Sequence, residues 1–231
     1  MHRIGKYTKD DLMSELVSDN YRVLLVMSRF GIGLGFGDST IDEVCRRNGV
    51  DTVTFITVAN MLLHDEVPNG ICEKISMQSL LQYLHNSHDY FLGFRLPAIR
   101  NKLLRSVGTS DDLSRAIIHY FDEYIAGVNT HMTYEEEVVF PYVHSLLDGH
   151  LQEDYNIDVF SRRHDQVETL LTEFKNIFIK YYPSASTNEI NSVLFDIFDC
   201  EYDLASHNAV EDLLFVPSVS ALEKKVEEAN K

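Results

Sequence analysis

Two segments of the chain each carry a histidine, a glutamate four residues later, and then an apolar run with a phenylalanine and a proline. They read HMTYEEEVVFP from His131 and HNAVEDLLFVP from His207. On an α-helix, residues i and i+4 lie on one face about one turn apart. Each segment can therefore aim an imidazole and a carboxylate, His131 with Glu135 and His207 with Glu211, at a common point. Such nitrogen and oxygen ligands suit a pair of first-row metal ions.

The same spacing occurs twice more, in His119 with Glu123 and in His164 with Glu168. Taken alone, any such pair is typical of two neighbouring side chains on a helix surface. His119 lies twelve residues before His131. On one helix this places the two about 120° apart, so both cannot face one core site. We expect His119 to be a surface histidine.

The chain that must position these residues is predicted to be all-α. It contains only five prolines and eleven glycines in 231 residues, and its long segments follow the 3.6-residue apolar period of amphipathic helices. We expect a small helical N-terminal domain, residues 1–74, with helices over about 9–30, 40–48 and 51–64. A glycine-rich breaker follows the first of these helices.

Residues 75–231 are predicted to form a four-helix bundle of up-down-up-down topology. The expected helices span about 76–107, 111–147, 155–181 and 186–216. The first two should begin at Ser76 and Asp111, which are favourable N-cap residues. Pro97 and Pro141 fall inside the helical patterns, which predicts a local kink or break at each.

Each bundle helix contributes a histidine at a similar level. The first offers His85 or its neighbour His88, of which we favour His85, and the third offers His164. The second and fourth offer the two His–Glu pairs. Four buried histidines and two buried carboxylates are too costly to leave without partners, and a metal removes that cost. Six such ligands suit a di-iron site in which each iron has two histidines and both glutamates bridge.

The chain resembles hemerythrin-like proteins, and more narrowly the repair-of-iron-centres family, over about residues 77–220. The matching segments are YLHNSH from Tyr83, RLP from Arg95, RHD from Arg163 and the two His–Glu segments. The resemblance implies two iron ions with an oxo or hydroxo bridge. It implies the following metal ligands: His85, His131, Glu135, His164, His207 and Glu211.

The N-terminal module resembles that family with one large departure. The stretch from Arg29 reads RFGIGLGFGDSTIDEVC, and Gly33 to Gly37 occupy the place of the family's adjacent cysteine pair. Thiol–disulfide chemistry needs two sulfurs within bridging reach, and Cys45 has no neighbouring cysteine. We therefore expect this module to dock or dimerise and not to act as a redox dithiol. Its helices would pair with a second copy of the chain, giving a homodimer, or with the bundle.

Charge, hydropathy and cysteine content indicate which partners and which cellular location to expect. The formal net charge is −16, which argues against a nucleic-acid partner. No apolar run approaches a membrane span, and the N-terminus lacks the apolar core of a signal peptide. The three cysteines, Cys45, Cys72 and Cys200, are widely spaced and fit a reducing cytoplasm.

The resemblance implies a stress-response protein that repairs iron–sulfur clusters damaged by nitric oxide or oxidants. Its partners would be the damaged iron–sulfur proteins or the small molecules NO and O2. One alternative is a module that binds or senses oxygen or nitric oxide without repair activity. Another is a structural bundle whose histidines are incidental. The residues alone predict the di-iron chemistry but not which of these roles it serves.

Overall fold

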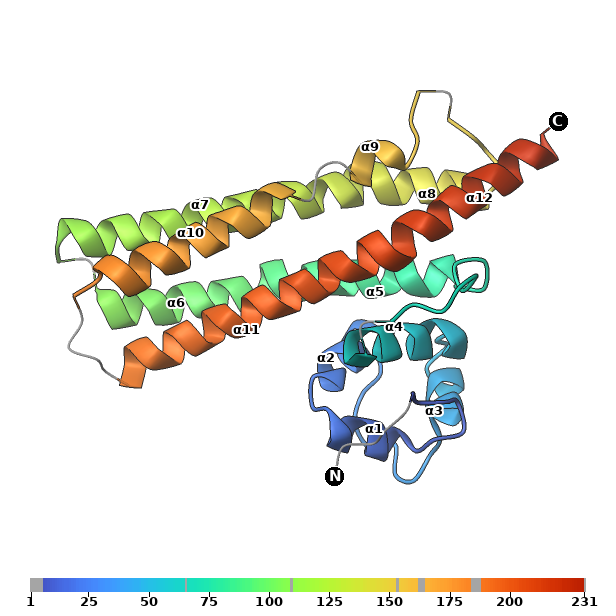
Figure 1. Cartoon of the computed structure of the whole chain (residues 1–231), viewed down its shortest axis with the longest axis horizontal. Coiled ribbons are helices and arrows are strands. Elements are labelled where there is room, and N and C mark those ends of the chain that lie inside the picture. Colours follow the sequence, from blue (N-terminus) through green and yellow to red (C-terminus); the bar gives the residue numbers. More distant parts are fainter. Residues whose placement is uncertain are drawn as a thin grey trace. The chain divides into compact units, whose positions relative to one another are not determined.

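The computed structural model of the chain is built from α-helices (Figure 1). It describes residues 6–64, 66–108, 110–152, 154–161, 165–183 and 188–230. Within those ranges the only extended pairing is an isolated bridge between Leu12 and Thr40. The all-α prediction is confirmed.

The chain divides into two compact units, and each is described by itself. The first comprises residues 1–87, 146–151 and 209–231, and the second comprises residues 88–145 and 152–208. The division falls inside continuous helical segments and does not test the predicted boundary near residue 74, which stays a prediction.

Four short helices open the first unit: α1 (Met13–Asp19), α2 (Val23–Arg29), α3 (Ile41–Arg47) and α4 (Thr52–His64). The single helix predicted over 9–30 is wrong, because two helices occupy that range. The break lies at Asn20, whose backbone is extended, with φ −146° and ψ 104°. Its side-chain Oδ1 accepts a hydrogen bond from the backbone N–H of Arg22 at 3.0 Å. Such a local side-chain bond competes with the helix ladder and favours a turn.

The next two helices begin where the sequence predicts. Thr40 caps α3 in a capping box, in which its side chain accepts from the backbone of Glu43 and the Glu43 carboxylate accepts from the backbone of Thr40. Asp51 precedes α4 and accepts from the backbone N–H of Thr54 at 2.8 Å. These bonds satisfy N–H groups that a helix start leaves without intrahelical partners.

The glycine run between α2 and α3 forms a turned loop, as predicted. Gly31, Gly35 and Gly37 have φ angles of +73°, +93° and +60°, in the left-handed region that other residues rarely adopt. Leu34 within this loop is 76% exposed. The loop thus presents an apolar side chain to solvent.

Cys45 is unsuited to thiol chemistry in the folded protein. It is fully buried in α3, and burial, with a smaller contribution from the Asp42 and Asp51 charges, raises the pKa of the Cys45 thiol to about 12. The reactive form of cysteine is the thiolate. None of the three cysteines, all in the described residues, forms a disulfide; Cys200 is also buried, whereas Cys72 is partly exposed.

We therefore expect a thiol-specific reagent to label Cys72 rapidly in the native protein, and Cys45 and Cys200 only when the chain unfolds. Mass spectrometry of peptides after timed alkylation at pH 8 measures this order, with denatured protein as the control in which all three react. Rapid native labelling of Cys45 would contradict the assignment of Cys45 as a structural thiol.

The remaining helices form the long segments predicted for the bundle. They are α5 (Met77–Tyr90), η1 (Phe91–Arg95), α6 (Leu96–Val107), α7 (Asp112–Tyr134), η2 (Glu135–Val139), α8 (Phe140–Leu147), α9 (Asp158–Ser161), α10 (Asp165–Tyr181), α11 (Asn188–Val210), η3 (Glu211–Phe215) and α12 (Val216–Ala229). The predicted caps are confirmed: the Ser76 hydroxyl accepts from the backbone of Ser79 at 3.3 Å, and Asp111 accepts from the backbone of Ser114 at 2.8 Å.

In the second unit, α6, α7, α10 and α11 run alongside one another, and consecutive helices are antiparallel (Figure 1). The pairing of α6 with α7 shows the direction. The Ser114 hydroxyl bonds the carbonyl of Val107 at the start of α7, and Arg100 pairs with Asp122 further along. The chain thus has the all-α bundle architecture that the sequence predicts.

The core of this unit is apolar and contains side chains from all four helices. Ile99, Phe121, Phe174 and Ile197, one from each helix, are at most 1% exposed and belong to one continuous cluster. Burial of such side chains stabilises a fold by about 1.5–3 kcal/mol each. No described helix is long and apolar enough to cross a membrane.

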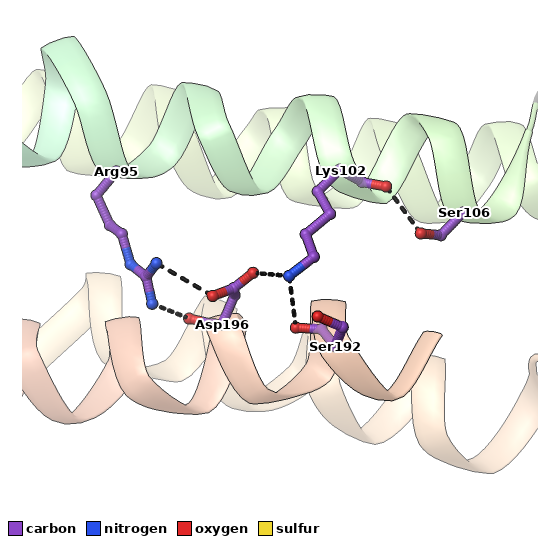
Figure 2. A network of polar contacts seen from close by, with 5 residues as sticks. All are labelled: Arg95, Lys102, Ser106, Ser192 and Asp196. Carbon is purple, nitrogen blue, oxygen red and sulfur yellow. Dashed lines mark hydrogen bonds and ion pairs between the residues drawn. The ribbon is translucent and has the colours of Figure 1, made fainter. Parts of the chain in front are cut away.

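A polar network ties η1 and α6 to α11 within the second unit (Figure 2). Arg95 donates to the Asp196 carboxylate at 3.2 Å and to its backbone carbonyl at 3.0 Å. Lys102 donates to the other carboxylate oxygen of Asp196 and to the carbonyl of Ser192. One carboxylate held by two cations fixes the register of these helices, and with it the level at which α11 continues toward His207.

Candidate metal centre

A π-helical segment interrupts each of three long helices six residues before a proline. The segments η1, η2 and η3 begin at Phe91, Glu135 and Glu211 and precede Pro97, Pro141 and Pro217. In each, the closing backbone bond runs to the residue five positions back, as from the Phe140 N–H to the Glu135 carbonyl in η2. Proline lacks an N–H, and its ring clashes with the carbonyl four residues back, which the wider turn relieves.

The predicted kinks or breaks at Pro97 and Pro141 therefore take a different form, because the helices continue through a π-helical turn. That turn matters for the site, since two of the three segments begin at a candidate ligand. Glu135 and Glu211 each start one, four residues after His131 and His207. π-helical turns in α-helices occur frequently at functional sites.

Four buried side chains meet around one point: His88, Glu135, His207 and Glu211. Each offers one ligand atom, and these atoms all lie within 4.8 Å of one another. The exposed fraction is 3% for His88 and 0% for the other three. Two carboxylates brought this close inside a protein repel each other and lose their hydration, and a bound cation offsets both costs.

Glu135 faces two different imidazoles. Its Oε2 lies 3.1 Å from Nε2 of His88, and its Oε1 lies 2.8 Å from Nε2 of His131. The His131 side chain is 11% exposed and its ring stacks against Phe160 at 6.2 Å. Each oxygen of the Glu135 carboxylate therefore lies beside a different imidazole.

The His88 ring is held on several sides. Its face stacks on Phe140, with centroids 5.5 Å apart and planes within 5°. Its Nδ1 lies 2.7 Å from Oε1 of Glu136, whose side chain is one-third exposed. Its edge meets the ring of His207 at 5.3 Å. The imidazole that reaches the centre from α5 is thus oriented by its neighbours.

The sequence-predicted ligands fall into three groups. Glu135, His207 and Glu211 lie in the cluster, and His131 lies against Glu135. His85 is exposed and is not among the clustered residues, so the preference for His85 over His88 is not supported. His164 lies outside the described residues. His119 has a side chain that is 72% exposed and stands 3.5 Å from Glu123, as predicted.

The model of the hemerythrin HHE cation-binding domain matches residues 79–219, more than half of the chain. The chain belongs to the hemerythrin HHE cation-binding family. A search of curated proteins found no match. The matched range contains the four clustered residues and His131, so the hemerythrin-like domain and the candidate centre coincide.

The donor set of this hemerythrin-like domain fits iron. Imidazole nitrogens and carboxylate oxygens are intermediate and hard ligands, a combination that suits iron among the first-row metals. No cysteine is within the cluster, which argues against a structural zinc site of the thiolate type. The residues present can hold a cation through two helices that contribute a His–Glu pair and a third that contributes a histidine.

Glu136 and His88 are the two site residues for which the sequence argument was incomplete. Glu136 sits in a run of three glutamates, and the helical period alone gives it no role. His88 had a usable signal in its spacing to the downstream proline. His131 and His207 each lie ten residues before their prolines, His88 lies nine before Pro97, and His85 lies twelve before it. The proline spacing thus favours His88.

Proposed function

We propose that this protein holds two iron ions with His88, His131, Glu135, His207 and Glu211 as ligands, and with His164 as the expected sixth. The observation that carries the proposal is the buried cluster of two histidines and two glutamates inside the hemerythrin-like domain. The position of Glu135 between His88 and His131 supports the count of two, since each carboxylate oxygen has its own imidazole partner.

The imidazoles, the carboxylates and the neighbouring aromatic rings have different roles at the proposed centre. The imidazoles supply neutral nitrogen ligands, and the two glutamates offset the positive charge of the cations. Both glutamates begin π-helical turns, so each carboxylate projects from a helix locally wider than its neighbours. Phe91, fully buried, meets the His207 ring at 5.9 Å, and Phe140 stacks on the His88 ring, so both imidazoles have an apolar neighbour.

Bound iron supplies redox chemistry and sites for small molecules such as NO and O2. The proposed role is repair of iron–sulfur clusters damaged by nitrosative or oxidative stress, in a reducing cytoplasm. Likeness to the repair-of-iron-centres family supports this role. Damaged iron–sulfur proteins are the proposed partners, docked through the N-terminal module or through a homodimer that it forms. The alternative is a module that binds or senses oxygen or nitric oxide.

Metal analysis tests the proposed centre. Protein purified without oxygen and loaded with Fe²⁺ should contain about two irons per chain, and ions in such paired sites lie about 3.5–4 Å apart, which X-ray absorption measures. Zinc alone, or less than half an iron per chain after loading, would overturn the proposal.

A reactivation assay separates repair from sensing. An iron–sulfur dehydratase inactivated by nitric oxide is incubated with the iron-loaded protein, and its recovered activity is followed with time. Repair predicts recovery well beyond that given by the same amount of free Fe²⁺. Reversible spectral changes with NO or O2, without any recovery of the dehydratase, would favour the sensing function.

A further inference from the structure

The two nitrogens of His88 face two consecutive glutamates. Nε2 lies 3.1 Å from Oε2 of Glu135 inside the cluster, while Nδ1 lies 2.7 Å from Oε1 of Glu136. Nδ1 and Nε2 flank Cε1 in the ring and point in different directions, so each nitrogen can meet its own carboxylate. Glu135 is fully buried, whereas the Glu136 side chain is 33% exposed and reaches in from the rim.

We propose that Glu136 is a positioning residue that sets the tautomer and the angle of the His88 imidazole. This inference rests on the proposed metal site. A neutral imidazole carries its proton on one nitrogen and a lone pair on the other. A metal at the cluster needs the lone pair on Nε2. The proton then stays on Nδ1, where Glu136 accepts it in a short, charge-assisted hydrogen bond.

Phe140 and Glu136 act on the His88 ring in different ways. Phe140 stacks on the ring face, which restricts rotation of the ring about its Cβ–Cγ bond. Stacking does not select the tautomer, whereas the directional contact of Glu136 at Nδ1 favours the proton there and leaves Nε2 facing the cluster. Glu136 comes from η2, the segment that also presents Glu135, so one π-helical turn places both a ligand and the support of a second ligand.

The second His–Glu segment differs at the matching position. Asp212 follows Glu211 as Glu136 follows Glu135, but Asp212 is exposed and one methylene shorter. Glu137, the next residue in η2, is also exposed. Glu137 carries the same side chain as Glu136 and lies in the same π-helical segment, one residue further from Glu135. Replacing Glu137 is therefore the matched control for replacing Glu136.

Anaerobic Fe²⁺ titration against a chromophoric chelator tests the proposal in the full chain. Glu136→Ala should weaken iron binding about 10–100-fold, the usual cost of removing the partner of a metal-bound histidine. Glu136→Gln keeps an acceptor oxygen without the charge and should fall between Glu136→Ala and the parent. Glu137→Ala should bind iron like the parent. Glu136 is partly exposed, so both of its variants are expected to fold, which circular dichroism checks.

A spectroscopic readout distinguishes positioning from a general effect on the fold. In the zinc-loaded, diamagnetic protein, the Nδ1-bound proton of His88 should give a downfield proton resonance. That signal should be lost or should exchange faster with water in Glu136→Ala and remain in Glu137→Ala. Unchanged iron affinity and an unchanged resonance in Glu136→Ala would overturn the inference while leaving the metal site intact. A parent protein that binds no metal would overturn both.

Discussion

Replacing Glu135 or Glu211 with alanine should abolish most iron binding while the helical fold survives. Both carboxylates are fully buried in the cluster, and Glu135 lies beside two imidazoles. Loss of a ligand should weaken binding beyond the roughly 10–100-fold cost of losing a supporting residue. The apolar core of α6, α7, α10 and α11 does not include either glutamate, so the helical content should be unchanged.

The thermal unfolding midpoint, measured with and without iron, tests the ligand role of Glu135 and Glu211 independently. Iron at about 1,000 times its dissociation constant stabilises the folded parent by about 4 kcal/mol, which corresponds to roughly 8–16 °C in the unfolding midpoint for a chain of this size. The iron-dependent increase should be absent in both alanine variants. Without iron, their midpoints should equal or exceed the parent's, because each variant removes a buried carboxylate.

The control is Glu137→Ala, which removes an exposed acid from the same π-helical segment. It should retain both the iron content and the iron-dependent midpoint shift. If Glu135→Ala and Glu211→Ala both keep the parent's iron content, neither residue is a ligand, and the assignment of the centre to this cluster is wrong.

Replacing His88 with alanine should cost more than about 100-fold in iron affinity, whereas His85→Ala should leave it unchanged. His88 is buried, and its Nε2 faces Glu135 within the cluster, while His85, three residues earlier on α5, is exposed. A surface substitution usually changes the free energy of unfolding by no more than about 0.5 kcal/mol, so the His85→Ala variant is expected to fold. Calorimetric Fe²⁺ titration of the two variants gives the comparison directly.

His85→Ala is the matched control for His88→Ala, because both variants remove an imidazole from the same helix. Equal loss in the two would indicate that the last turns of α5, and not one ligand, control metal binding. Loss in His85→Ala alone would restore the original sequence assignment and require α5 to sit differently when metal is bound.

The local features of the chain are those that the sequence predicted well. Ser76 and Asp111 cap helices where expected, because a cap depends on bonds within three or four residues. The pairing of His131 with Glu135 is also local, since one helical turn brings the two side chains together. Where the prediction of one helix over 9–30 is wrong, the cause is equally local, because a side-chain bond at Asn20 competes with the helix.

The amino-acid sequence by itself determined an all-α bundle and two His–Glu faces, because helical period, caps and i,i+4 spacing all act within a few turns. Only the tertiary structure shows that His88, and not the exposed His85, lies in the buried His–Glu cluster. His85 and His88 are three residues apart on one helix, so the choice depends on which face packs against η2 and α8, where Glu135, Glu136 and Phe140 lie. The contact of Glu136 with His88, on which its proposed role rests, likewise lay beyond the sequence, since it joins residues 48 positions apart in the chain.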